Sequence, residues 1–368
     1  MRRTFLIVTR ALPLALLLAA CAHQPGQVAS RGAASYNRGV QDLDSGNYDA
    51  SIAENTEAIM LDPKLGVAYF NRGLAYLRQH RYQQAIQDFD QVIALNPQDG
   101  AAYGMRGVAY GDTNHLDTAL QDLNQAIALD ASEPINFGNR AELWYRKGNY
   151  DQALRDVSQA LALKPADADA HYNRGVIYQK KHDDAQALAD YDEAVRLNPR
   201  LSSALLNRGV IHHERKEFDR AIQDYSQALA VEPNSAMGLL NRGVAYGDKG
   251  LNDLALADLD RTVALDPRDA LGYYNRGVVH WAKGQPAQAF ADYNQAIGLD
   301  ARMASAYNNR GVIYATRHDF ANALKDYTTA ISLDPNDSKV RANLASAQEH
   351  KVGIVASGAA VQAEPASH

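Results

Sequence analysis

An asparagine recurs along this chain at intervals of thirty-four residues or a multiple of that number. Its primary amide offers two hydrogen-bond donors and an acceptor, so it can pair with both the N–H and the C=O of an extended peptide. A row of such amides would bind a peptide with little regard to its side chains. The alternative is that each amide bonds only to the neighbouring repeat. The predicted peptide-binding residues are Asn71, Asn139, Asn173, Asn207, Asn241, Asn275 and Asn309, and Asn37 occupies the same register.

An apolar residue lies three positions after most of these asparagines, which places it beside the amide on one face of a helix. We therefore expect an apolar strip next to the row of amides. Its members are Val40, Leu74, Val108, Val176, Val210, Val244, Val278 and Val312.

An arginine directly follows the asparagine position, and an acidic residue comes sixteen positions after each arginine. We predict one partly buried arginine–carboxylate pair per repeat, with the arginine stem packed as an apolar rod. A row of phosphate sites is the alternative, but the matched acids would repel phosphate. The pairs are Arg38 with Glu54, Arg72 with Asp88, Arg106 with Asp122, Arg140 with Asp156, Arg174 with Asp190, Arg208 with Asp224, Arg242 with Asp258, Arg276 with Asp292 and Arg310 with Asp326.

No motif in the sequence predicts catalysis. His212, His213 and Glu214 are adjacent on a helix and point in different directions, whereas a metal site would need partners three or four residues apart. The sequence also has no phosphate loop, nucleophile elbow, zinc-protease helix or paired-cysteine motif. We therefore expect no enzyme activity, no cofactor and no metal.

The elements that must position these residues follow one pattern, which is clearest in residues 304–337. Gly311 and Tyr314 fall at helical spacing, then Ala323 and Tyr327 do so, and Pro335 closes the unit. Two amphipathic helices separated by a polar turn account for this spacing. In seven of the repeats the turn position holds glycine or histidine, so we expect a positive φ there. It is occupied by Gly46, His80, Gly148, His182, Gly250, Gly284 and His318.

A fixed period of this length indicates a stacked helix–turn–helix array. The pattern resembles the tetratricopeptide repeat family, through a small residue at the eighth position, an aromatic or histidine three residues later and a closing proline. The resemblance covers residues 32–337 as nine repeats. The small residues are Gly73, Gly107, Gly175, Gly209, Gly243, Gly277 and Gly311.

The resemblance implies an all-α chain that forms a right-handed superhelix, the solenoid of this family. Its first helices would line a concave groove that binds proteins or peptides, with the asparagines facing that groove. Residues 338–351 are expected to form a C-terminal capping helix, and residues 352–368 a disordered tail. The matching helix faces carry Val, Leu and Tyr in place of the Lys and Arg of a carboxylate clamp, so we expect no recognition of acidic C-terminal tails.

The first repeat is the weakest match to the pattern. Asp42, Ser51 and Asn55 occupy positions that are aromatic, small and aromatic elsewhere. Terminal repeats of solenoids are often polar where one face meets water, so we expect a polar cap. The alternative is a loosely packed repeat that docks a partner.

The start of the chain differs from the rest. Residues 1–20 carry three arginines and then an apolar run that is too short to span a bilayer and suits a signal peptide. The run ends in Leu-Ala-Ala-Cys, which resembles a bacterial lipobox and implies acylation of Cys21, the only cysteine. An ordinary cleavable signal is the alternative. Residues 21–31 are expected to be the acylated cysteine and a flexible tether, and Ala22 favours the outer membrane, on its periplasmic face.

The chain has 368 residues, of which 46% are hydrophobic, and a net charge of −6. No basic stripe is present to neutralise phosphates, so nucleic acid is not expected as a partner. The most consistent interpretation is a lipid-anchored adaptor whose groove holds extended segments of other envelope proteins, in envelope maintenance, secretion or pilus assembly. The alternative is a self-associating structural lipoprotein, that is, a homo-oligomer.

Overall fold

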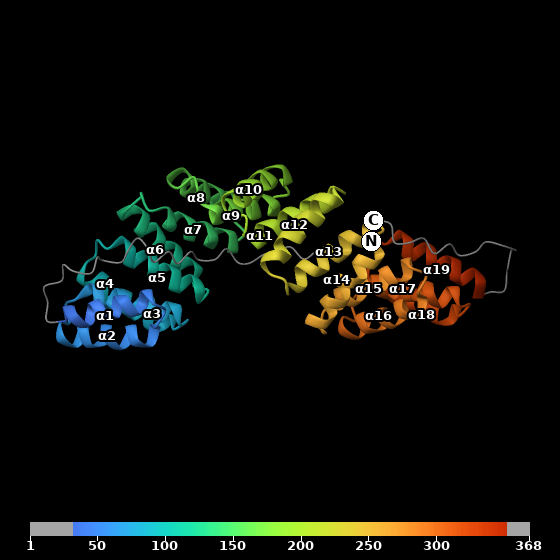
Figure 1. Cartoon of the computed structure of the whole chain (residues 1–368), viewed down its shortest axis with the longest axis horizontal. Helices are drawn as coiled ribbons and strands as arrows, with labels where there is room; N and C mark the ends of the chain where they lie inside the picture. The colour runs from blue at the N-terminus through green and yellow to red at the C-terminus, as the bar shows by residue number, and fades with distance from the viewer. Residues whose placement is uncertain (1–31, 352–368) are drawn as a thin grey trace. The chain divides into compact units, whose positions relative to one another are not determined.

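The structure is a computed structural model that describes residues 32–351 (Figure 1). Those residues form α-helices and no strand, which confirms the predicted all-α class, the nine helix pairs and the C-terminal helix. The first helices of the nine repeats are α1 (Ala33–Asp44), α3 (Gly66–Arg78), α5 (Gly100–Asp112), α7 (Pro134–Arg146), α9 (Ala168–Lys180), α11 (Ser202–Glu214), α13 (Ala236–Asp248), α15 (Ala270–Ala282) and α17 (Ala304–Thr316).

Each first helix is followed by a second helix of fourteen residues. The second helices are α2 (Tyr48–Leu61), α4 (Tyr82–Leu95), α6 (Leu116–Leu129), α8 (Tyr150–Leu163), α10 (Asp184–Leu197), α12 (Phe218–Val231), α14 (Asn252–Leu265), α16 (Pro286–Leu299) and α18 (Phe320–Leu333). The chain divides into two compact units, one with α1–α10 and the other with α11–α18 and α19 (Ser338–Lys351).

Within each unit the helices stack in chain order. The two helices of a repeat pack on each other, and each second helix packs on the following first helix. First helices of neighbouring repeats also meet directly, as α3 does with α1 and α5, and α13 with α11 and α15. Because each hairpin has an apolar side that only a neighbour can cover, the array buries a series of apolar clusters along each unit.

A glycine at the eighth position of most repeats allows the two helices of a hairpin to approach closely. A Cβ added at Gly175 would lie 2.6 Å from the ring of Tyr191, and one at Gly209 would lie 2.6 Å from the ring of Tyr225. The fourth repeat has Ala141 at this position and the smaller Val157 opposite. The small eighth residue therefore makes room for a large side chain on the second helix.

The turns between paired helices confirm the predicted backbone. His80, His182 and His318 have φ values of 58°, 60° and 59°, and the four turn glycines lie between 70° and 80°. Asn114 and Lys216 have the same conformation at the two remaining turns of this type, at 63° each. Pro286 is the first residue of α16, where its missing N–H costs little.

The first repeat differs from the prediction of a polar cap facing water. Ser51 and Asn55 are both 0% exposed. Ser51 Oγ donates to the carbonyl of Gly39 at 2.7 Å, and Asn55 Nδ2 donates to the carbonyl of Ser51 at 2.8 Å. The expectation was wrong for these two residues, because Asn55, which replaces a large apolar or aromatic side chain of the other repeats, bonds to Ser51 inside the repeat.

The last helix, α19, covers the end of the array. Val340 and Ala347 are buried against α18, whereas Arg341, Gln348 and Glu349 are exposed. None of the helices in residues 32–351 combines the length and apolarity needed to cross a bilayer. The expected signal peptide, Cys21, the tether and the C-terminal tail lie outside the described residues.

Candidate functional site

The predicted peptide-binding residues lie on one face of the first helices. We call this surface the asparagine face, and define it as the asparagine position of each repeat together with the residue three positions later. Within each unit, several neighbouring first helices are in contact, as α3 is with α1 and α5, and α13 is with α11 and α15. The same contacts bury much of the asparagine face.

Burial differs among the seven predicted residues. Asn173 and Asn309 are half-buried, and the other five are almost completely enclosed. Their exposed fractions are 3% for Asn71, 1% for Asn139, 0% for Asn207, 0% for Asn241 and 2% for Asn275. The apolar strip is buried as well, apart from the half-buried Val312. A bound segment would therefore reach most of these amides only after covering side chains move.

Some of the asparagines bond to the preceding repeat, as the alternative interpretation expects. The hydroxyl of Tyr36 is in hydrogen-bond contact with the amide of Asn71. Asn309 Nδ2 lies 3.5 Å from the hydroxyl oxygen of Tyr274, and Asn343 Nδ2 donates to Asn308 Oδ1 at 3.0 Å. These bonds all join residues thirty-five positions apart, so they hold one first helix against the next.

Other amide atoms on the asparagine face have no hydrogen-bond partner within residues 32–351. They are Asn71 Nδ2, Asn173 Oδ1, Asn275 Oδ1 and both polar atoms of Asn139. A buried amide without a partner loses the full free energy of its hydration. Asn139 is therefore the residue with the most unused hydrogen-bonding capacity among these four asparagines.

Sequence reasoning missed Glu142, which occupies the strip position of the fourth repeat. It is 3% exposed, and no described residue bonds its Oε2. Burial raises the pKa of Glu142 to about 8, with Arg146 opposing the shift and Asp112 adding to it. The available signal was the single break in an otherwise apolar strip.

The predicted arginine–carboxylate pairs are confirmed in all nine repeats. In eight of them the arginine donates from both Nε and Nη2 to the two oxygens of one aspartate; in the first repeat, Arg38 reaches Glu54 through Nη2 at 2.8 Å. For Arg140 and Asp156 both distances are 2.7 Å. The pair lies between the two helices of one repeat, so it fixes how they pack.

The same arginines reach the preceding repeat, which the sequence pattern did not predict. Arg140 Nη1 donates to Asn124 Oδ1 on α6 at 2.8 Å, and Arg106 Nη1 donates to Asp90 on α4 at 2.6 Å. Each such arginine therefore joins three helices. Burial raises the pKa of Asp88 in spite of the bonds from Arg72 that lower it, so desolvation offsets much of the attraction. Fixing the register of neighbouring repeats is the clearest consequence.

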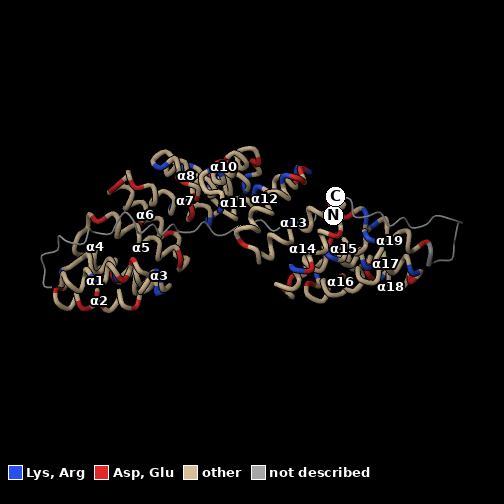
Figure 2. The backbone as a smooth tube through the Cα atoms, viewed as in Figure 1, with Lys and Arg blue, Asp and Glu red and all other residues tan. Residues whose placement is uncertain are grey.

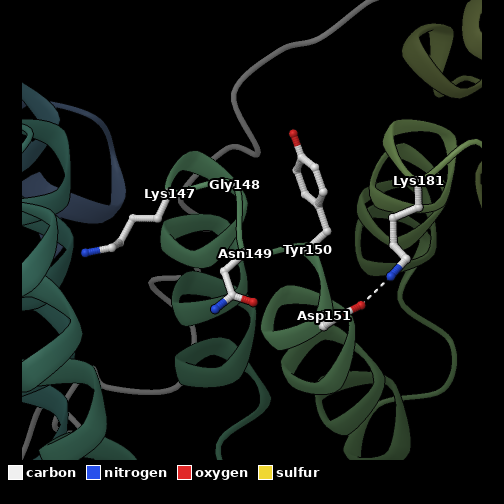
Figure 3. Close-up of a pocket in the computed structure, with 6 residues that line it drawn as sticks. All are labelled: Lys147, Gly148, Asn149, Tyr150, Asp151 and Lys181. Atoms are coloured by element: carbon white, nitrogen blue, oxygen red, sulfur yellow. Dashed lines mark hydrogen bonds and ion pairs between the residues drawn. The ribbon is translucent and has the colours of Figure 1, made fainter.

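A hollow at the turn between α7 and α8 is not a second functional site. It is lined by Lys147, Gly148, Asn149, Tyr150, Asp151 and Lys181 (Figure 3). Lys181 pairs with Asp151, Lys147 pairs with Asp117, and Asn149 accepts a bond from the first turn of α8. These polar groups are used in joining repeats and capping a helix.

Figure 2 shows acidic and basic residues interspersed along the helices of both units. Several lie at the turns, where lysines pair with aspartates of the preceding repeat, as Lys249 does with Asp219 and Lys283 with Asp253. Those pairs use charges of both signs that would otherwise act on a ligand.

Family models for the tetratricopeptide repeat match most of the array. They match residues 66–99, 100–133, 168–201, 202–235, 240–304 and 304–337, and a model described as TPR repeat matches residues 141–181. Together these matches cover more than half of the chain. A search of curated proteins gave no match.

Solved structures with similar folds are distant in sequence. A tetratricopeptide repeat protein from Parabacteroides merdae is 23% identical, with a TM-score of 0.53, over 68% of this chain and 99% of that one. The APC/C hetero-tetramer Cut9-Hcn1 is 14% identical, with a TM-score of 0.55, and the match covers 86% of this chain and 76% of that one. PilW, a widely conserved type IV pilus biogenesis factor, is 20% identical, with a TM-score of 0.50, and the match covers 55% of this chain and 94% of that one. These likenesses establish the fold alone.

Proposed function

Because the chain belongs to the tetratricopeptide repeat family, we propose that it is a protein-interaction scaffold that binds extended segments of partner proteins on its asparagine face. The partners would be other proteins of the bacterial envelope. The identity of the partner would decide whether the protein acts in envelope maintenance, secretion or pilus assembly.

The observation that carries this proposal is the unused hydrogen-bonding capacity of Asn139. Its Nδ2 and Oδ1 are buried and meet no partner among the described residues. The backbone of an extended segment presents both an N–H and a C=O, so one residue of the segment would satisfy both atoms. Asn173, in the same position of the next repeat, offers a further unpartnered acceptor.

Binding of a segment requires limited rearrangement of the first helices. Asn71 and Asn139 are buried and Asn173 is half-buried, so covering side chains must move aside. Moving these side chains costs free energy, and the hydrogen bonds that the buried amides form with the segment offset part of that cost. We therefore expect moderate affinity and a slow association step.

We further propose attachment to the periplasmic face of the outer membrane through an acylated Cys21. The support is the lipobox-like run that ends at this cysteine and the absence of any other cysteine with which to pair. One acyl chain binds membranes only weakly, so stable anchoring would need more than one. The anchor would concentrate partners at the membrane surface.

Affinity purification from detergent-solubilised membranes tests the scaffold. The test variant replaces Asn71, Asn139 and Asn173 with Ala. We expect a partner, identified by mass spectrometry, that the wild-type chain captures and this variant does not. Circular dichroism should give the same helicity for both chains.

The matched control removes three amides from exposed positions on second helices of the same unit, with Gln91, Gln125 and Gln159 replaced by Ala. This variant should capture the partner as the wild type does. If the asparagine variant keeps the partner, the asparagine face is not the binding surface.

Membrane attachment has its own test, which is independent of the partner. The Cys21→Ser variant should move from the membrane fraction to the soluble periplasmic fraction, because it cannot be acylated. Retention of the variant in the outer-membrane fraction would exclude Cys21 as the anchor.

A further inference from the structure

One repeat breaks the apolar strip of the asparagine face, and the other repeats serve as its comparison. The strip position holds Val or Leu in eight repeats and Glu142 in the fourth. The same repeat has Gly138 just before the asparagine. The third repeat also has a glycine there, Gly104, but a Cβ added to it would lie 2.6 Å from Asn136 Oδ1, and the second and fifth repeats carry Phe70 and Tyr172. A Cβ added at Gly138 would meet no atom within 4 Å. An acid and open space therefore occur together on α7.

The polar groups around this space are buried and unused. Asn139 is 1% exposed and Glu142 is 3% exposed, and Glu142 Oε2 and both amide atoms of Asn139 have no partner in residues 32–351. Arg146, one turn further along α7, donates to the carbonyl of Gly111 at 2.9 Å and to Asn114 Oδ1 at 3.1 Å. Its guanidinium is therefore committed to α5 and the turn that follows it.

We infer that Gly138, Asn139 and Glu142 form an anchor site for a lysine or arginine side chain of the bound segment. The inference rests on the proposed function, because it assigns a specificity to the same face. The amide of Asn139 would hold the backbone of the segment, and the carboxyl of Glu142 would bind the cationic end of the side chain.

The charges that act on Glu142 favour a cation over other ligands. Burial and the carboxylate of Asp112 on α5 raise the pKa of Glu142 to about 8, and Arg146 lowers it by less than burial raises it. The free site therefore holds a neutral carboxyl at pH 7. A cation within hydrogen-bond reach favours the ionised form, and the proton passes to solvent.

Other side chains fit the site less well. An acidic side chain would place its charge near Asp112, and the neutral carboxyl of Glu142 would offer it no charge of opposite sign. An apolar side chain would leave the oxygen of Glu142 buried without a partner, which costs the hydration free energy of that group. A basic side chain is the one that would form an ion pair with the carboxyl of Glu142.

Selection from a library of random dodecapeptides displayed on phage tests the inference on the full chain. Peptides selected by the wild type should share a Lys or Arg at one fixed position. Peptides selected by the Glu142→Val variant, which restores the residue of the other repeats, should lack it. The affinity of the best basic peptide should fall by at least about tenfold in this variant.

Two further variants guard against effects on folding. Glu142→Gln keeps the shape of the side chain and should also lose the preference for basic residues. Val176→Leu changes the strip in the next repeat to a residue that the second repeat already carries, and should keep the preference.

The outcomes separate this inference from the proposed function. If wild type and Glu142→Val select the same basic position, the anchor lies elsewhere and the inference is wrong. If the wild type selects peptides that share no basic position, the inference is wrong and the peptide-binding face stands. If the wild type selects no peptide at all, both are wrong.

Calorimetry on the selected peptide gives a second readout. Titrations at pH 7 in buffers of different ionisation enthalpy should show release of up to about one proton on binding. The same peptide with norleucine in place of the basic residue should release none. Equal proton release by both peptides would contradict ionisation of Glu142.

Discussion

Arg140 and Asp156 show what a single repeated pair does for the molecule. The two side chains are mostly enclosed between α7 and α8, and the arginine also bonds to α6. Removing the arginine leaves Asp156 as a buried charge without its partner. We expect Arg140→Met to lower the free energy of unfolding by about 3 kcal/mol, measured by urea denaturation.

The first repeat provides the matched control for this prediction. Arg38 pairs with Glu54 at 2.8 Å, but its side chain is 51% exposed. Arg38→Met should therefore cost much less free energy of unfolding than Arg140→Met. The double variant Arg140→Met, Asp156→Leu should recover much of the loss. Equal costs for Arg38→Met and Arg140→Met would contradict a role of burial.

Glu142 makes the stability of the chain depend on pH. Its pKa is about 8 in the folded chain against a reference value of 4.5, so the folded state holds this proton more tightly. Stability from Glu142 is fully present below about pH 4.5 and is lost as pH rises toward 8. The loss should be on the order of a few kcal/mol across this window.

The measurement compares wild type with Glu142→Gln by urea denaturation at several pH values. The difference between the two free energies of unfolding should grow between about pH 4.5 and 8, with the wild type losing stability as the pH rises. A difference that is the same at every pH would mean that the carboxyl stays hydrated.

At the scale of the element, the turns depend on a left-handed residue. Gly148 has a φ of 75° at the turn between α7 and α8. An alanine there adopts this conformation only with strain, so Gly148→Ala should lower the free energy of unfolding by about 1–2 kcal/mol. Thermal denaturation followed by circular dichroism would show this as a lower Tm.

Gly298 is the control for the same substitution in a helical position. It lies inside α16, and a Cβ there would meet nothing within 4 Å. Gly298→Ala should raise the free energy of unfolding by up to about 1 kcal/mol, because alanine loses less entropy in a helix. If both substitutions lowered the free energy of unfolding, the backbone conformation would not decide whether alanine stabilises or destabilises the chain.

The helices and turns could be predicted from sequence because each position is sampled nine times. The glycines and histidines at the turn and the arginine–carboxylate pairs all follow from one repeated spacing. The prediction failed for Ser51 and Asn55, because polarity alone does not distinguish a side chain facing water from one bonded inside the core. The bonds from several of these arginines to the preceding repeat were missed because their partner position varies among Thr, Asp, Asn and Ser.

At the scale of the whole molecule, sequence predicted which residues share the asparagine face but not how deeply they lie. Spacing places Asn139 and Asn241 at the same register, whereas burial depends on how closely neighbouring first helices approach. The size of the residue before each asparagine also matters, since Tyr36 bonds to the next asparagine and Gly138 cannot. These details are set by pairs of residues in different repeats, which one period does not reveal.

Photo-crosslinking in intact cells tests most directly whether partner proteins bind on the asparagine face. A photoreactive phenylalanine derivative would replace Ile135, which lies four residues before Asn139 and seven before Glu142 and so on the same face of α7. The control places the same residue at Gln125, which is exposed on α6. We predict a covalent adduct with a partner protein from position 135 and none from position 125. An adduct from position 125 alone would contradict binding on the asparagine face.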